Sequence, residues 1–178
     1  TIYISGALDS DDYTGSISKL DIESVEIGIS VTSIGYHAFK ECTNMVSVTM
    51  TDSLTTISEA AFEATGLQSV TIPDSVTSVG NSTFVVSHSL QSVVIGNGLT
   101  STADTMFYNC VNLESVTIGN SLQTISTNTF YNCNSLQSIN LPDSITSIED
   151  NAFKNCNDTN FTTITIPSSV TSLGSNVF

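Results

Sequence analysis

The chain has 178 residues, which is enough for one domain with a continuous apolar core. It has 17 acidic residues against three lysines and no arginine, and the formal net charge of −14 repels phosphate backbones and anionic lipid, which excludes nucleic-acid binding. The same charge is compatible with divalent cations, cationic partners or a saline exterior, and it selects none of them.

The first 23 residues read as an incomplete copy of a pattern that fills the rest of the chain. Ile2 and Ile4 form an apolar–x–apolar pair, which is typical of a strand with alternate side chains turned inward. After Leu8 the apolar positions become polar. We therefore expect a degenerate N-terminal capping coil over 1–23 within a single domain over 1–178.

The polar stretch inside this cap leaves a second interpretation open. Asp9, Asp11 and Asp12 lie close together, as acidic ligands do in calcium-binding loops. An EF-hand loop, however, needs its glycine one place before Gly15 and a glutamate where Leu20 stands. We favour a solvated cap and predict no metal and no cofactor, with calcium at the three aspartates as the alternative.

From residue 24 to 178, one unit of about 23 residues is repeated. An apolar pair opens each unit, and a phenylalanine closes it at spacings of 22 to 25 residues. A single unit cannot bury these side chains, whereas stacked units share one core. The phenylalanines are Phe39, Phe62, Phe84, Phe107, Phe130, Phe153 and Phe178. The pairs are Val25/Ile27, Val48/Met50, Val70/Ile72, Val93/Ile95, Val116/Ile118, Ile139/Leu141 and Ile164/Ile166.

These periods predict an α/β repeat solenoid, a right-handed stack with one parallel β-sheet formed by the apolar pairs. Residues such as Pro73 and Gly96 follow the pair and end the strand, and side chains such as Asp74 then bond local backbone N–H groups. Segments such as Ile57–Phe62 are expected to form short helical or irregular turns on the opposite side, carrying the phenylalanine inward. Thr102 is the one polar residue in an otherwise apolar column.

The unit reads L-x-S-V-T-I-P-D-S-V-T-S-I-G-x-x-A-F-x-x-C, best seen in Leu67–Phe84 and Leu136–Cys156. This pattern resembles the BspA-type leucine-rich repeats of bacterial and protist surface proteins, over about residues 22–178. The resemblance implies a leucine-rich-repeat stack, an extracellular or cell-surface location, and adhesion or binding to a protein or glycan. It carries over no catalytic residue, and we expect the chain not to be an enzyme.

The outward-facing residues of the predicted strands are the candidate partner-binding surface. They form two columns rich in serine and threonine, with almost no charge. A plain solvated sheet is the alternative, because threonine is a good strand former. A third reading is an ordered-water face like that of ice-binding proteins, which the curvature expected of this fold disfavours. The candidate residues are Ser47, Thr49, Ser69, Thr71, Ser92, Val94, Ser115, Thr117, Ser138, Asn140, Thr163 and Thr165.

The four cysteines share one column, three positions after the phenylalanine, where small residues stand in the other coils. This favours free cysteines in a tight packing slot, with a bridge between neighbouring coils or a zinc site as alternatives. His37 and His88 lie in different columns and are interpreted as surface residues. The cysteines are Cys42, Cys110, Cys133 and Cys156.

Asn81, Asn157 and Asn160 begin glycosylation sequons, which matter only in a eukaryotic secretory pathway. No run of about 18 apolar residues is present to span a membrane, and no segment has the features of a signal peptide. Val177 and Phe178 lie in a half-written coil, so we expect an apolar edge that another coil or subunit covers. A structural subunit stacked end to end, in a filament or a longer surface protein, is therefore the alternative function.

Overall fold

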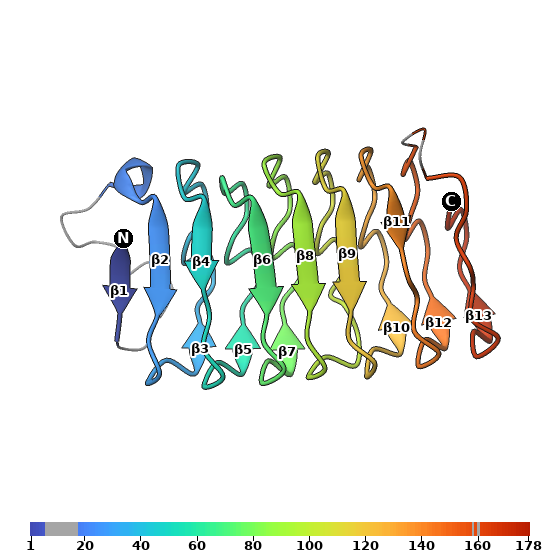
Figure 1. The fold of residues 1–178 in the computed structure, drawn as a ribbon, viewed down its shortest axis with the longest axis horizontal. Helices are drawn as coiled ribbons and strands as arrows, with labels where there is room; N and C mark the ends of the chain where they lie inside the picture. Colours follow the sequence, from blue (N-terminus) through green and yellow to red (C-terminus); the bar gives the residue numbers. More distant parts are fainter. Residues whose placement is uncertain (6–17, 158, 160) are drawn as a thin grey trace.

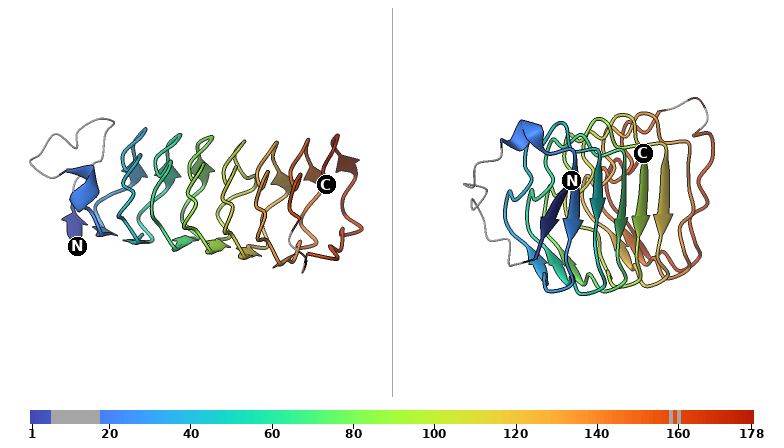
Figure 2. Two further views of the ribbon diagram at one scale, coloured as in Figure 1. Left: turned by 90° about the horizontal axis from the view of Figure 1, so that it is seen from above. Right: turned by 60° about the vertical axis from the view of Figure 1, so that its left-hand side comes forward.

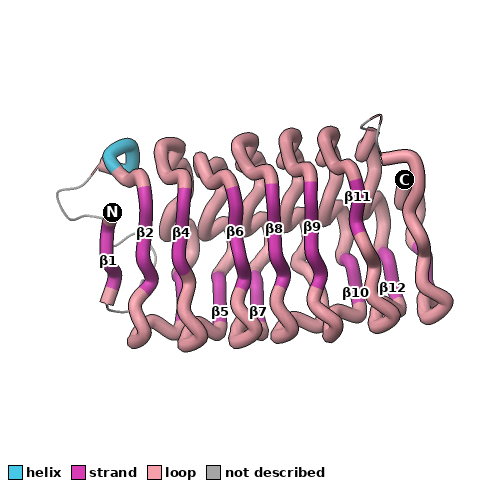
Figure 3. The backbone as a smooth tube through the Cα atoms, viewed as in Figure 1, coloured by secondary structure: helices cyan, strands magenta, loops and turns pink. Residues whose placement is uncertain are grey.

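The chain forms a parallel β-solenoid of about seven turns, seen in a computed structural model that describes residues 1–5, 18–157, 159 and 161–178 (Figure 1). The coils stack along one axis, with β1 at one end and the last coil at the other (Figure 2). The predicted solenoid is confirmed. Among the described residues the one helical element is a 3₁₀ turn, η1, at Lys19–Asp21, so the predicted helical turns are absent there (Figure 3).

The apolar pairs form a column of parallel strands, which we call the front sheet. Paired strands are in register, so that Ser69 lies beside Ser92 and Ser92 beside Ser115. The column is hydrogen-bonded in two groups, β1-β2-β4 and β11-β9-β8-β6, with a break between β4 and β6. The strands are β1 (Ile2–Ile4), β2 (Ser24–Ile27), β4 (Ser47–Thr49), β6 (Ser69–Ile72), β8 (Ser92–Ile95), β9 (Ser115–Ile118) and β11 (Ser138–Ile139).

The prediction holds at one end of this column and fails at the other. At the N-terminal end β1 pairs with β2, Ile2 opposite Val25, so the register predicted for the degenerate coil is confirmed. At the other end the predicted pair Ile164/Ile166 forms no strand. Pro167 follows that pair, and a proline has no N–H to donate to the preceding coil.

Most of the described coils also contribute to a second, narrower column, so the prediction of one sheet is wrong. Its strands are two residues long, too short for any alternation to show in the sequence. The second column pairs as β3-β5-β7 and β10-β12-β13, with only the bridge Ser101–Thr124 in the coil between them. The strands are β3 (Ser33–Ile34), β5 (Thr56–Ile57), β7 (Ser78–Val79), β10 (Thr124–Ile125), β12 (Ser147–Ile148) and β13 (Ser172–Leu173).

The interruption in the second column coincides with Thr102. This residue is buried, and its Oγ1 accepts a hydrogen bond from the Ser126 N–H at 2.8 Å and lies 2.8 Å from Thr129 Oγ1. Thr129 in turn donates to the Ser126 carbonyl at 2.7 Å. A buried hydroxyl is tolerated only when it is hydrogen-bonded, and here a small buried network supplies those bonds.

The phenylalanines form a single interior stack, as the repeat predicts. Neighbouring rings from Phe39 to Phe153 lie 5.2 to 5.5 Å apart between centroids, with interplanar angles of 4° to 13°. All six of these rings are at most 1% exposed. Phe178 continues the stack at 5.9 Å from Phe153 but is 58% exposed.

The backbone around each phenylalanine, the turn side of the coil, is not helical because it contains left-handed residues. Ala60 and Ala64 flank Phe62 with φ of 53° and 54°, and the equivalent positions of the other coils share this conformation. A left-handed residue cannot continue a right-handed helix. Instead the N–H of Phe62 donates to the Thr83 carbonyl in the next coil at 2.9 Å, and the flanking N–H groups donate in the same direction. The stack therefore has a polarity along its axis.

Candidate recognition face

The outward residues of the front sheet form in-register columns, as predicted. Ser69, Ser92, Ser115 and Ser138 are aligned by strand pairing, and so are Thr71, Val94 and Thr117. In β4, Ser47 and Thr49 align instead with Ser24 and Glu26 of β2. Thr163 and Thr165 are exposed but belong to no strand. The structure thus brings together ten of the twelve candidate positions in strands or directly after one, in two groups.

A third exposed column lies one position before these serines, and the sequence interpretation did not include it. It is formed mainly by long amide side chains, and Gln91 donates its backbone N–H to the Gln68 carbonyl at 2.8 Å. These residues precede the strands, outside the alternating pattern that marked the other two columns. They are Val46, Gln68, Gln91, Glu114 and Gln137, all exposed.

The residue that follows each strand determines how closely its coil approaches the preceding coil. Gly96 and Gly119 donate their N–H groups to Ile72 and Ile95 of the preceding coil at 2.9 and 2.8 Å. A Cβ at position 96 would lie 2.7 Å from the Ile72 carbonyl oxygen, closer than atoms can approach. Proline carries such a Cβ and has no N–H, so a coil with proline at this position cannot form the bond.

Strand pairing follows this rule along the front sheet. The coils with Gly96 and Gly119 pair with their predecessors over four residues. The coil with Pro142 pairs over only two, and the coil with Pro73 contributes no ladder to the strand before it. The break between β4 and β6 is therefore located at Pro73.

The same residues control a ladder of Asp and Asn side chains at the strand ends. The Asn97 N–H donates to Asp74 Oδ1 at 2.7 Å, and the Asn120 N–H donates to Asn97 Oδ1 at 2.8 Å. Both donors follow a glycine. Within the described chain no such bond reaches the carboxylate of Asp52 or Asp143, whose partners in the next coil would follow Pro73 and Pro167. These two exposed carboxylates have no hydrogen-bond partner in the described chain.

An open hollow in the surface accompanies each of the two proline-bearing strand pairs. One lies between β4 and β6, the other between β9 and β11. Both have half-buried or buried apolar side chains at the base, a proline in the wall, hydroxyl or amide groups around them, and one of the unpartnered aspartates at the rim. The first is lined by Ser47, Val48, Thr49, Met50, Asp52, Ser69, Thr71 and Pro73. The second is lined by Ile118, Asn120, Asn140, Leu141, Pro142, Asp143 and Ser144.

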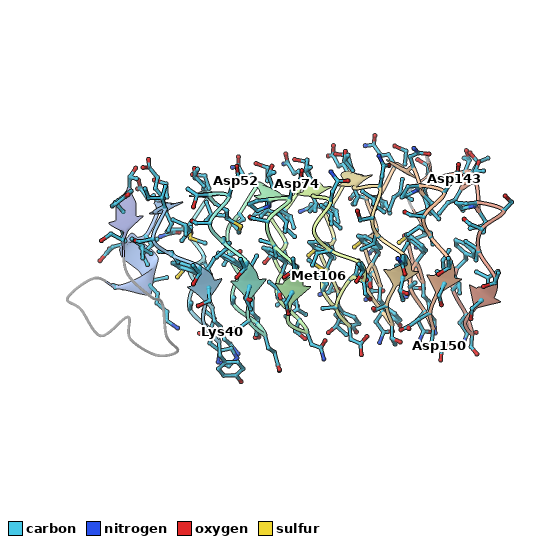
Figure 4. All side chains as sticks on the ribbon, turned by 90° about the horizontal axis from the view of Figure 1, so that it is seen from below. Lys40, Asp52, Asp74, Met106, Asp143 and Asp150 are labelled. Atoms are coloured by element: carbon cyan, nitrogen blue, oxygen red, sulfur yellow. The ribbon has the colours of Figure 1, made fainter. Side chains whose placement is uncertain are left out.

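In the part of the chain that the structure describes, every charged side chain on the front-sheet strands and just after their ends is acidic. Asp52, Asp74 and Asp143 lie along one edge of the solenoid, and Lys40 projects from the other side (Figure 4). The Lys40 ammonium lies 3.0 Å from the Glu63 carboxylate, and this hydrogen bond raises the lysine pKa. Lys154, also directly after a core phenylalanine, lies 5.7 Å above the Tyr131 ring centroid. The remaining lysine, Lys19, is in η1.

The cysteines are free, so the disulfide alternative is not supported. The thiols of Cys110, Cys133 and Cys156 donate to the carbonyl of the phenylalanine in the preceding coil at 3.1 to 3.3 Å. Ser87, in the same column, makes the equivalent bond to Phe62 at 3.1 Å. Burial raises the pKa of Cys110 and Cys156 to about 12. Thiols held in the protonated form are poor nucleophiles, so this column is structural.

The other sequence candidates form no reactive cluster among the described residues. His37 packs against Tyr36 at 3.6 Å between ring centroids, and the exposed His88 Nε2 lies 3.2 Å from Asn109 Nδ2. No group of three or more His, Cys, Asp or Glu side chains in the described chain could hold a metal ion. The three aspartates proposed for calcium lie outside the described residues, as does Asn160. Asn81 and Asn157 are exposed.

No helix among the described residues is long and apolar enough to cross a membrane.

Val177, expected at the apolar edge, is buried at 7% exposure, and Leu173 instead joins Phe178 as an exposed apolar side chain of the last coil.

Three solved bacterial proteins share this architecture. A leucine-rich repeat protein from Eubacterium ventriosum is 26% identical with a TM-score of 0.83, over 88% of this chain and 42% of that one. A leucine-rich repeat protein from Bacteroides ovatus is 25% identical with a TM-score of 0.70, over 89% of this chain and 46% of that one. A leucine-rich repeat protein of T. pallidum is similar in fold, at 22% identity and a TM-score of 0.61, over 97% of this chain and 66% of that one.

The chain spans less than half the length of the first two of these solved structures. Among curated proteins none matches it. The model of the BspA type leucine rich repeat region matches in six copies, over residues 15–137 and 100–178. Together these matches cover most of the sequence and coincide with the coils described above. The chain therefore belongs to the BspA-type leucine-rich-repeat family.

Proposed function

We propose that this chain is an extracellular or cell-surface recognition module that binds a protein or glycan partner through its front sheet, without catalysing a reaction. The observation that carries the proposal is the in-register array of outward side chains on β6, β8, β9 and β11, most of which are exposed hydroxyl groups. The chain belongs to a repeat family that is associated with cell surfaces and adhesion, which supports the proposed location and role.

The physical case rests on what such a face offers a partner. Hydroxyl and amide groups on rigid strands form hydrogen bonds without the desolvation cost of burying charges. The Phe stack beneath fixes the strands, so little order is lost on binding. Four aligned strands also give a continuous surface, which suits an extended partner better than a small molecule.

A binding screen tests the proposal. The chain is applied to a panel of immobilised extracellular-matrix proteins and to a glycan array, as wild type and as the double variant Ser92→Lys, Thr117→Lys. Thr100→Lys is the matched control, because Thr100 is exposed but lies outside the front sheet. We expect a specific partner that the double variant loses and the control retains. A partner retained equally by both variants would contradict the use of this face.

A second candidate function, end-to-end stacking, is supported by the last coil. Phe178 and Leu173 are 58% and 57% exposed there. The N–H groups of Asn176 and Phe178 have no acceptor in the described chain, whereas the equivalent groups of Asn151 and Phe153 donate to the last coil. A further coil, whether of this chain or of a second copy, would cover this apolar surface and accept from these donors.

Light scattering across a range of protein concentrations tests this second function. If the ends associate, the mean mass rises with concentration and Phe178→Asp prevents the rise. A constant monomer mass for the wild type would rule it out.

A further inference from the structure

The two hollows of the front sheet, with Asp52 and Asp143 at their rims, have the composition of sites for basic side chains. A lysine or arginine carries an apolar stem and a charged end. In the first hollow the stem would lie against Met50 and Pro73, and the charged end would reach the Asp52 carboxylate. In the second, Leu141 and Pro142 correspond to the apolar base and wall, and Asp143 to the acceptor.

The carboxylates at these rims differ from the other aspartates along the coil edges. Asp74 and Asp150 accept backbone N–H groups of the next coil, from Asn97 and Ser175, at 2.7 and 2.6 Å. Those two carboxylates are used by the fold. Asp52 and Asp143 make no such bond in the described chain, so they remain available to an outside cation.

The surrounding charge selects the sign of the partner. Glu26, Glu114 and Asp74 are exposed on or beside the front sheet, and two of the three lysines lie on the turn side, directly after a core phenylalanine. The net charge of the chain is −14, and the described front-sheet strands contain no lysine or arginine that could compete for Asp52 or Asp143. A cationic partner is therefore attracted and oriented by this face, while an anionic one is repelled.

The distance between the hollows defines the spacing of the basic residues. Three strand-to-strand steps separate the two hollows and four separate the coils of the two aspartates. At about 4.8 Å per step these distances are about 14 and 19 Å. An extended peptide advances about 3.4 Å per residue and turns every second side chain to the same face. Residues four or six positions apart therefore lie on one face and span about 14 or about 20 Å.

We propose that the front sheet binds an extended peptide segment that lies along the solenoid axis and carries two lysine or arginine residues four or six positions apart. This inference rests on the proposed recognition function and names its partner class. Each exposed ion pair contributes little by itself. Two ion pairs together raise the affinity further, because the second one forms within a complex that the first already holds together.

Fluorescence anisotropy with synthetic peptides tests the spacing. Labelled threonine–glycine peptides carry two lysines separated by two, three, four, five or six positions, at low ionic strength. We expect the four- or six-residue spacing to bind at least about tenfold more tightly than the two-, three- and five-residue spacings. Equal affinity at all spacings would overturn the inference, because it indicates attraction to the net charge alone.

Charge-matched variants locate the binding. Asp52→Asn and Asp143→Asn should each remove the spacing preference, whereas Asp104→Asn should keep it, because Asp104 is equally exposed but lies outside the front sheet. None of the three carboxylates has a hydrogen-bond partner in the described chain, so the fold is retained. A loss of the preference in Asp104→Asn, or displacement of the peptide by neutral oligosaccharides from the two hollows, would also overturn it.

This test can fail while the proposed recognition function stands. In that case the peptides bind without spacing preference, yet the partner found in the binding screen still depends on Ser92 and Thr117. If no partner depends on Ser92 and Thr117, the recognition function itself fails, whatever the peptides show.

Discussion

The turn side and the front sheet of this solenoid differ in how strictly their contacts are repeated from coil to coil. On the turn side, Phe39 to Phe153 stack without interruption, although one unit is a residue shorter than its neighbours. On the front sheet, the ladder is lost between β4 and β6 and shortened between β9 and β11. The core column fixes the stack, and the strand ends are free to vary.

This difference has a local chemical cause. Aromatic rings in contact and backbone N–H groups pointing along the axis require the same residue class in every coil. The position after the strand, in contrast, accepts glycine, proline or threonine, and this residue determines how closely its coil approaches the preceding coil. Surface shape can thus change from coil to coil without disturbing the core.

Removing a ring from the stack should have the largest effect. Phe107→Ala leaves a cavity between two stacked rings and should lower the free energy of unfolding by about 3–5 kcal/mol. Phe178→Ala, at a 58% exposed position, should cost less than about 1 kcal/mol. Urea denaturation of both variants measures the contrast, and similar losses would show that the stack is not the main support.

Placing a proline in a glycine coil should have the next largest effect. Gly96→Pro removes the N–H bond to Ile72 and introduces a Cβ that would lie 2.7 Å from its carbonyl oxygen. We expect a loss of about 2 kcal/mol and a new break between β6 and β8, seen as faster amide exchange in both strands. If amide exchange in both strands is unchanged, the residue after the strand does not control strand pairing.

The buried thiols predict a loss of stability at alkaline pH. Burial raises the pKa of Cys110 from 9.0 to about 12, so the folded state holds its proton where the unfolded state releases it. This stability is fully present below pH 9 and is lost between pH 9 and about 12, at about 1.4 kcal/mol per pH unit. Denaturation at pH 8 to 11 should show a shallower slope for Cys110→Ser, and an identical slope would refute the assignment.

The smallest expected change in stability concerns the hydrogen bond made by a cysteine of this column. Cys133→Ser keeps a donor for the Phe107 carbonyl, as Ser87 does for Phe62, whereas Cys133→Ala leaves that carbonyl without it. We expect alanine to be about 1 kcal/mol less stable than serine. Thermal unfolding of the pair decides this, and a serine variant as unstable as alanine would show that the donor contributes nothing.

The sequence predicted the parts of the fold that depend on a repeated residue class. The column of seven phenylalanines and the register of Ile2 and Ile4 with β2 followed from spacing, and the resemblance of the repeat unit indicated the family. The turns on the opposite side did not follow from spacing. Asn128 favours the left-handed conformation by its type, but Ala60 and Val86 share that conformation and do not favour it, so residue type did not identify these positions as a class.

The candidate site was predicted only as columns of exposed residues. Its hollows depend on Pro73 and Pro142, which the sequence showed as strand ends but not as gaps between coils. The gap arises because the proline of one coil lacks an N–H and places a Cβ against a carbonyl of the preceding coil. This is a relation between coils, and the spacing of residues along the sequence does not reveal it. The availability of Asp52 follows from the same relation.

A crystal structure of the double variant Pro73→Gly, Pro142→Gly tests the account most directly. We predict an unchanged phenylalanine stack, a ladder between β4 and β6, and the Asp52 carboxylate bonded to the Asp74 N–H, with both hollows closed. If the hollows and the break persist with glycine at both positions, the residue after the strand does not control the recognition face, and the account is contradicted.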